Sequence, residues 1–420
     1  MPLGSLGCEW TPRSKAATSA MLLTLIGGAL GVLAVGLSLL TAYLLFLTCA
    51  AVIVRLSRKE AGFGPGLRRF GVLIPAHDEE TLVGRLLASL EQLDYPRENY
   101  DVCVVADNCS DRTADLARST GARVYERFDT ERKAKGFALH WLLEQLRDEG
   151  SQYDAFVVLD ADSVVSANFL RGMDFRLERG SQVVQAYYSV SNAGQSTVTS
   201  LRSAALAAIH YVRPLGRSLL GLSCGLKGNG MCFAASIIER FGWRWFTLAE
   251  DVEFHLALIR AGIRVDFAPE ATVQADMPVT LAQAATQNAR WEQGRLLLVR
   301  RSVPGLIARA LRTGSLAQLD AAAEQLIPPL SVPFALSGLC VVSAWALGSL
   351  ELAVLGGLNL LGQMLYVLVG LTLVGAPRQT FVALSTAPVY IAWKLGLYCR
   401  ALVRGQGSPW VRTTRAAPES

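Results

Sequence analysis

The stretch FVVLDADSVV, residues 156–165, sets four apolar residues directly before two aspartates, Asp160 and Asp162. A short, continuous apolar run is typical of a strand that is buried on both faces of a parallel sheet. An ionised carboxylate at the end of such a strand is costly to bury unless it is paired or bound to a metal. The two aspartates therefore predict a nearby cation, although aspartate also caps ordinary turns after strands.

Apolar strands and helical patterns alternate on both sides of this stretch. The spacing predicts strands at 70–75, 100–106, 122–126 and 154–160, and helices at about 79–93, 111–120 and 134–148. This alternation predicts an α/β domain with a mostly parallel sheet that helices cover on both faces.

Polar residues gather where three of these strands end. They are residues 77–80, residues 107–111, and the pair Asp160 and Asp162. Ligands of open parallel sheets bind at the carboxyl ends of the strands. Carboxylates that converge there favour a hard divalent cation, Mg²⁺ or Mn²⁺, which bridges to the phosphates of a ligand.

The apolar residues of this 420-residue chain are concentrated at 21–54 and at 326–403, whereas 70–300 has an ordinary globular composition. A membrane span needs about 20 apolar residues. We expect one long helix over 21–54, with a tight hairpin as the alternative. The expected divisions are an N-terminal tail at 1–20, a transmembrane segment at 21–54, a globular domain at 70–300, an interfacial helix at 301–325, a transmembrane region at 326–403 and a basic tail at 404–420.

The charges and cysteines indicate the compartment of the 70–300 domain, its partners and the redox state of its thiols. Basic residues follow the first apolar run more densely than they precede it, which places the 70–300 domain in the cytoplasm by the positive-inside rule. The net charge of +5 comes from basic residues beside the apolar runs. This favours anionic lipid headgroups over nucleic acid. The eight cysteines have no zinc-type spacing, which favours reduced, buried thiols.

Two further segments of the middle domain carry ligand-type residues. GLKGNGMCF, residues 225–233, predicts a glycine-rich turn that enters a strand, and an ordinary hairpin is the alternative. TLAEDVEFHLALIRAG, residues 247–262, predicts a helix with Glu250 and Asp251 in its first turn. Acids at that position also stabilise a helix through its dipole alone.

The segment ATQNARWEQGR, residues 285–295, places Gln287, Arg290, Trp291 and Gly294 on one face of a helix. An arginine and a tryptophan beside a membrane segment can serve as an interfacial anchor. They can also hold a phosphate and stack on a sugar or a base.

Taken in order, PAHDEE, VADNCSD, KAKGFAL, LDADS, KGNG, LAEDVEF and QNARW, followed by apolar helices, resemble the membrane-bound branch of the family 2 inverting glycosyltransferases. That branch includes cellulose, chitin, hyaluronan and poly-N-acetylglucosamine synthases and ceramide glucosyltransferase. The resemblance covers residues 70 to 415 and implies a GT-A nucleotide-sugar fold. Ala249 before the acidic pair, and QNA before Trp291, depart from many polymer synthases and leave processivity open.

The resemblance also implies a role for each matching residue. Asp251, with Glu250 beside it, would be the catalytic base, and Asp160 and Asp162 would hold the metal. The donor nucleotide would meet Asp107, Asp160, Lys135, Glu79, Arg290 and Gln287, and the acceptor would meet Trp291, Gly228, Asn229 and Gly230.

The implied function is a metal-dependent membrane enzyme that transfers a sugar from a UDP-sugar with inversion, and so forms a β-linked exopolysaccharide. The alternative is a single addition to a lipid such as a ceramide, a diacylglycerol or a polyprenyl phosphate. A catalytically dead scaffold subunit is the third possibility. The expected location is the plasma (inner) membrane, with export or assembly subunits as further candidate partners.

Overall fold

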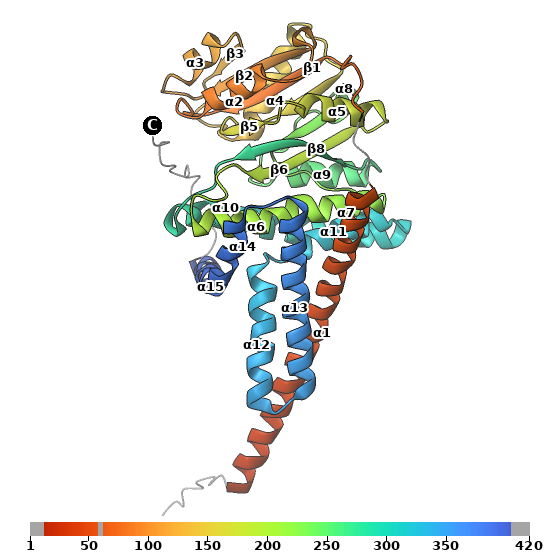
Figure 1. Cartoon of the computed structure of the whole chain (residues 1–420), viewed down its shortest axis with the longest axis vertical. Coiled ribbons are helices and arrows are strands. Elements are labelled where there is room, and N and C mark those ends of the chain that lie inside the picture. The colour runs from red at the N-terminus through yellow and green to blue at the C-terminus, as the bar shows by residue number, and fades with distance from the viewer. Residues whose placement is uncertain (1–11, 58–61, 405–420) are drawn as a thin grey trace, which may run out of the picture. The chain divides into compact units, whose positions relative to one another are not determined.

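The computed structural model describes residues 12–57 and 62–404 (Figure 1). Residues 405–420 of the basic tail predicted at 404–420, and the first residues of the predicted N-terminal tail, lie outside these ranges. The chain divides into two compact units, Met1–Leu45 with Pro329–Leu365, and Phe46–Pro328 with Tyr366–Ser420. We describe each unit by itself.

The larger unit is built on an eight-stranded mixed sheet with the order β3-β2-β1-β4-β7-β6-β8-β5. Neighbours β3, β2, β1 and β4 are parallel, as are β6 and β8, whereas β7 is antiparallel to both its neighbours and β5 to β8. The prediction of a mostly parallel sheet is confirmed. The strands are β1 (Phe70–Ala76), β2 (Tyr100–Asp107), β3 (Arg123–Arg127), β4 (Ala155–Val158), β5 (Ser163–Val165), β6 (Val183–Val190), β7 (Met231–Ala234) and β8 (Asp266–Ala275).

Helices cover both faces of this sheet. Alternate residues of β1, such as Val72 and Ile74, share a buried cluster with apolar residues of α2 (Val83–Glu91), α3 (Thr113–Ser119) and α5 (Phe169–Glu178). Successive side chains of a strand point to opposite faces. The other set, which includes the fully buried Leu73, therefore faces away from this cluster, and α4 (Lys135–Asp148) packs on β1 and β2.

The opening stretch forms two strands rather than one. β4 ends at Val158, and the chain turns through Asp160 and Asp162 into β5, which pairs with β8. The apolar run ends where the aspartates begin because those residues leave the buried centre of the sheet. Asp160 therefore lies at the carboxyl edge of β4, as expected.

The remaining helices of this unit follow the strands or lie beyond β8. They are η1 (Arg97–Asn99), α6 (Thr197–Ala207), η2 (Ala208–Val212), α7 (Arg213–Leu219), α8 (Ala235–Phe241), α9 (Glu250–Arg260), α10 (Leu281–Thr313), α11 (Leu316–Leu326), α14 (Arg378–Ala383), η3 (Leu384–Thr386) and α15 (Ala387–Arg404). Apolar residues of α9, α10 and α11, Leu256 and Leu306 among them, form a second buried cluster.

The predicted boundaries around α10 are wrong. A single helix, α10, runs through both the expected 285–295 helix and the first half of the expected 301–325 interfacial helix. Pro304 lies inside it, and the helix ends at Gly314 in a left-handed conformation. The second half of that interfacial segment is the separate helix α11.

The smaller unit contains most of α1 (Pro12–Ser57), together with α12 (Ser331–Leu347) and most of α13 (Leu350–Leu373). α1 is one continuous helix rather than a hairpin, and it begins at Pro12 instead of Met21, so the expected tail is shorter. Two buried side-chain amides of α13 lie among the apolar side chains of this unit. Gln363 donates to Ser337 at 3.0 Å, and Asn359 donates to the Ala34 carbonyl at 3.2 Å.

Three helices in the described residues are long and apolar enough to cross a membrane: Met21–Ser57, Leu350–Leu373 and Arg378–Arg400. A fourth candidate, by length and composition, is the pair of helices Leu316–Leu326 and Ser331–Leu347, if the two count as one broken span. Pro328 and Pro329 occupy the break, where they cannot continue a helix.

Candidate active site

The turn after β4 lies beside the glycine-rich turn before β7. The two strands pair with Val158 opposite Met231, so the residues just past Val158 neighbour those just before Met231. The Gly230 amide donates to the Val158 carbonyl at 3.0 Å, and the Asp160 amide donates to Asn229 Oδ1 at 3.1 Å. Strand pairing thus brings together two motifs that are about seventy residues apart in the sequence.

The Asn229 side chain holds this turn in place. It is fully buried, and its Nδ2 donates to Ser163 Oγ at 2.8 Å. Gln185 of β6 also holds the glycine-rich turn. Its Nε2 donates to the Asn229 carbonyl at 2.8 Å, and its Oε1 accepts from the Lys227 amide at 2.9 Å. Sequence reasoning missed Gln185, although a glutamine within the apolar strand VVQAYY was the available signal.

Lys135, at the first turn of α4, supplies a positive charge beside Asp160. Its ammonium donates to Asp160 Oδ1 at 2.5 Å and also to the Gly228 carbonyl. The lysine therefore joins the aspartate turn to the glycine turn. A charge-assisted contact of this kind holds both backbones in a defined position.

Asp251 lies against the same glycine turn, and Glu250 precedes it in the sequence. Both residues begin α9, and a β-carbon built on Gly228 would lie 3.3 Å from Asp251 Oδ2. Burial raises the pKa of Glu250, and the neighbouring Asp251 adds to the effect. Burial also raises the pKa of Asp251, while Lys135 opposes it. A buried carboxylate with a raised pKa, close to a lysine, is suited to accept a proton.

The carboxylates after β4 fit a divalent cation by their chemistry. Asp160 and Asp162 offer hard oxygen donors, and the Asp160 side chain is 36% exposed although Lys135 contacts one of its oxygens. Mg²⁺ typically uses one or two protein carboxylates and completes its shell with substrate oxygens and water. The residues at this turn are compatible with such a shared site.

A different set of potential ligand atoms lies at the ends of β1 and β2. One atom each from Asp78, Cys109 and Asp111 lies within 4.8 Å of the others. These groups already close the loops: Asp78 Oδ1 accepts from the Ser110 amide at 2.7 Å, and Asp111 Oδ1 accepts from the Thr113 amide at 2.9 Å. Their hydrogen bonds therefore account for their positions without a metal.

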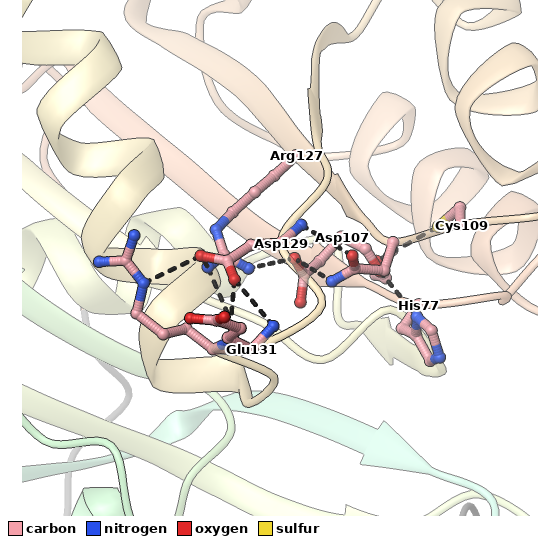
Figure 2. A network of polar contacts seen from close by, with 9 residues as sticks. His77, Asp107, Cys109, Arg127, Asp129 and Glu131 are labelled. Carbon is pink, nitrogen blue, oxygen red and sulfur yellow. Dashed lines mark hydrogen bonds and ion pairs between the residues drawn. The ribbon is translucent and has the colours of Figure 1, made fainter.

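Asp107, at the end of β2, belongs to a buried polar network (Figure 2). Arg127 Nη1 contacts Asp107 Oδ1 at 2.5 Å, and Arg127 Nη2 contacts Asp129 Oδ2 at 2.9 Å. His77 lies beside the pair, with Nδ1 2.7 Å from the Asp107 carbonyl oxygen. Glu79 follows β1 nearby, and its amide donates to Thr113 Oγ1 at 2.8 Å. Sequence reasoning missed the ion pair of Asp107 with Arg127.

The helix face predicted at 285–295 meets an arginine that sequence reasoning also missed. Gln287 is buried, and its Oε1 accepts from Nη2 of Arg202 on α6. The Arg202 guanidinium carbon also lies 5.3 Å from the centre of the Trp291 ring. Gln287 and Trp291 thus share one partner, as residues on one helix face should. The only sequence signal for Arg202 was a lone arginine among small and apolar residues in LRSAALA.

Comparison with known proteins identifies the family. The profile of the family described as "Glycosyltransferase like family 2" matches residues 65–294, from just before β1 into α10. The chain belongs to this family. The matched range includes β1 to β8, the Lys135–Asp160–Gly228 contacts and the acids of α9, so it covers the candidate site as one continuous segment.

Curated relatives of the glycosyltransferase are similar over this same part. It is 26% identical over 242 residues to the "Probable glycosyltransferase YdaM" of Bacillus subtilis, which covers 56% of each chain. It is 26% identical over 233 residues to the "Beta-monoglucosyldiacylglycerol synthase" of Trichormus variabilis, which covers 53% of this chain and 48% of that protein. The chain spans about half the length of the curated relatives it matches.

A solved structure supports the GT-A fold of the glycosyltransferase. The mannosyltransferase PcManGT from Pyrobaculum calidifontis, solved with GDP-Man and Mn²⁺, superposes with a TM-score of 0.52 at 20% identity. The superposition covers 83% of this chain and 98% of that one. At this identity the likeness establishes the fold, and the family profile establishes the enzyme class.

Proposed function

We propose that this family 2 enzyme is an integral-membrane, inverting glycosyltransferase that moves a sugar from a UDP-sugar to an acceptor hydroxyl and forms a β-linked glycan. The observation that carries the proposal is the set of contacts among Lys135, Asp160, the Gly228 turn and Asp251. These residues combine phosphate-side charges with a buried base at one edge of one sheet.

In this proposal the donor side is formed by residues at the ends of β2 and β4. Asp160 and Asp162 would hold Mg²⁺ or Mn²⁺, which when bound neutralises charge on the diphosphate leaving group. Lys135 keeps Asp160 in position through its hydrogen bond to Oδ1. Asp107 would contact the uridine from the network shown in Figure 2. Glu79, Gln287 and Arg290 complete the proposed donor contacts.

On the acceptor side, Asp251 would remove the proton of the attacking hydroxyl. Its carboxylate faces the Gly228 turn, where the absence of a side chain leaves room for a sugar to approach. A single displacement by that hydroxyl inverts the anomeric carbon, so an α-linked donor yields a β-linked product. Trp291 is 40% exposed, which leaves part of its ring free to stack on an acceptor.

A carboxamide variant tests the role of the base. Asp251→Asn keeps the shape of the side chain but removes the base, so kcat should fall by about 10²- to 10⁴-fold, while UDP affinity stays at the wild-type value. Glu253→Gln, in the first turn of the same helix, is the matched control and should turn over normally. Full turnover by a folded Asp251→Asn protein would falsify the assignment.

The donor and the metal are tested together. The purified full chain in detergent is incubated with radiolabelled UDP-glucose, UDP-N-acetylglucosamine, UDP-galactose or GDP-mannose, each with Mn²⁺, Mg²⁺ or EDTA. We expect incorporation from one UDP-sugar and its loss in EDTA. Incorporation from GDP-mannose alone, or undiminished turnover in EDTA, would contradict the proposed donor or metal.

The second candidate is a single addition to a membrane lipid. It is favoured by the Trichormus relative, whose name describes a glucosyldiacylglycerol synthase, whereas a Staphylococcus epidermidis relative named as a poly-N-acetylglucosamine synthase is 24% identical over 227 residues. Separation of the products by size distinguishes the two, because a polymer gives a ladder and a glycolipid gives one organic-soluble species.

The proposed location is the plasma membrane, with the catalytic unit on the cytoplasmic side, where nucleotide sugars are made. The candidate spans and the basic residues beside them support this orientation. Labelling of an introduced surface cysteine on intact cells by an impermeant thiol reagent tests it. Protection of the catalytic unit is the expected result, and labelling from outside would reverse the orientation.

A further inference from the structure

Arg202 is a buried arginine without an acidic partner among the described residues. It is 5% exposed, and its Nε has no hydrogen-bond partner. The hydrogen bonds of its guanidinium within the described residues are to neutral groups, the Gln287 side-chain oxygen and Met277 Sδ at 3.4 Å. A buried cation that lacks an anion is unfavourable, so this guanidinium is prepared for a negative charge that the chain itself does not supply.

Two other buried arginines in the same unit show the contrast. Arg217 contacts Asp320 at 2.8 Å and Glu324 at 2.7 Å, and Arg213 contacts Glu324 at 3.3 Å. The acids of α11 therefore neutralise the arginines of α7. No such acid faces Arg202 within the described part of the chain. Burial lowers the pKa of Arg202, and the groups that oppose this shift are Tyr390 and Tyr188, not carboxylates.

The surroundings of Arg202 include α15, the last candidate membrane helix. Tyr390 of α15 lies close enough to the Arg202 side chain to interact with its charge, and Trp291 of α10 presents its ring to the guanidinium. Lys394 follows Tyr390 by one helical turn, so it lies on the same face of α15. Tyr390, on this face, interacts with Arg202, and Lys394 lies one turn farther along it.

Lys394 also lacks an ion pair with any described residue. Its Nζ lies 5.8 Å from the centre of the Tyr398 ring. The nearby Glu292 is already engaged, because it contacts Arg295 at 2.9 Å and accepts from the Tyr398 hydroxyl at 3.2 Å. Arg202 and Lys394 are therefore two cations with incomplete charge compensation at one helix, α15. This helix belongs to a candidate membrane span.

We propose that Arg202, Tyr390 and Lys394 bind the phosphate group of a membrane lipid, and that this lipid is the acceptor-side ligand next to Trp291. A phosphate oxygen can accept from the free Arg202 Nε and from the Lys394 ammonium together. The acyl chains then lie along α15, which belongs to the candidate span Arg378–Arg400. The inference rests on the proposed acceptor role of Trp291.

A pair of lipids that differ only in the phosphate tests this site. The full chain in neutral detergent is titrated with phosphatidic acid or with diacylglycerol of the same acyl chains, and bound lipid is counted by native mass spectrometry. We expect phosphatidic acid to bind at least about tenfold more tightly, the effect of one charge-assisted hydrogen bond. Equal affinities for the two lipids would overturn the proposal.

Variants locate the binding on the named residues. Arg202→Gln and Lys394→Gln should each weaken phosphatidic acid about tenfold, whereas Arg400→Gln, an exposed cation of the same helix, should change nothing. Arg202→Lys keeps the charge and should retain part of the binding, and Lys394→Gln carries the test if Arg202→Gln does not fold. Wild-type binding by folded Lys394→Gln and Arg202→Lys would refute the site.

Competition separates the lipid phosphate from the donor diphosphate. UDP should leave phosphatidic acid bound, and Lys394→Gln, which lies outside the proposed donor contacts, should bind UDP as the wild type does. Displacement of the lipid by UDP or by inorganic phosphate would assign the site to a soluble phosphate instead. The measurement needs no turnover, so Asp251→Asn should bind phosphatidic acid normally. Lipid binding therefore stands or falls separately from the proposed sugar transfer.

Discussion

Gly228→Ala adds one methyl group at the point where the glycine turn faces the proposed base. Gly228 has a φ of +77°, and the new β-carbon would lie 3.3 Å from Asp251 Oδ2. The substitution therefore has two separable effects. It forces a residue with a β-carbon into the left-handed region, and it presses on one carboxylate oxygen.

The two effects have different magnitudes and different readouts. The left-handed conformation costs an alanine about 1 kcal/mol, which for a domain of this size lowers Tm by about 2–4 °C. The close contact moves the carboxylate by a few tenths of an ångström. Since a misplacement of about 1 Å can cost about 10²-fold in rate, we expect kcat to fall by about three- to tenfold.

Gly262→Ala is the matched control. Gly262 ends the segment that carries Asp251, its φ is +78°, and its added β-carbon would meet no heavy atom within 4 Å. Tm should decrease by the same amount in both variants when the detergent-solubilised protein is unfolded by heat. Only Gly228→Ala should show a lower kcat with the preferred donor. Equal kcat in the two variants would refute the placement of Asp251 against the turn.

Three other perturbations follow from the buried charges. Arg127→Met strands the Asp107 carboxylate and should cost about 3–5 kcal/mol of unfolding free energy, and chemical denaturation that detects less than about 1 kcal/mol would show that the pair is not buried in solution. Burial lowers the pKa of His255 to about 3, so its neutral form stabilises the protein above its unfolded pKa of about 6.5 and this contribution is lost as the pH falls toward 3. The destabilisation caused by His255→Gln should therefore shrink by about 2 kcal/mol between pH 7 and pH 5, whereas parallel stability curves would contradict the shift. Lys135 lowers the pKa of Asp251, so Lys135→Met should move the acidic limb of the kcat–pH profile to higher pH. An unchanged limb would show that the lysine does not act on the pKa of the base.

The sequence predicted the architecture well where each signal was local. Continuous apolar runs identified β1, β2 and β4, because a strand covered on both faces has no polar side to alternate with. Asp160 and Asp162 marked the carboxyl edge of β4, because carboxylates are unfavourable in the buried centre of a sheet. The boundaries of α10 were wrong because 301–325 was taken as a separate interfacial helix, whereas α10 runs from Leu281 to Thr313 and continues through Pro304.

The order of motifs along the chain was sufficient to place the protein among the family 2 glycosyltransferases and to nominate Asp160, Lys135 and Asp251. These residue types report their chemistry directly, since a buried acid must be matched by a cation or a metal wherever it lies. The candidate membrane spans could also be predicted from the sequence, because about 20 consecutive apolar residues are enough to cross a membrane.

Only the tertiary structure decided which charges meet. Lys135 reaches both Asp160 and Gly228, Asp107 is paired with Arg127, and Arg202 contacts Gln287 across 85 positions while lacking an acid of its own. A pattern in sequence records the type and spacing of residues within one helix or strand, whereas ion pairs and unpaired cations depend on how distant elements pack together. The proposed lipid-phosphate site arises from that packing, because its three residues come from α6 and α15 and share no motif.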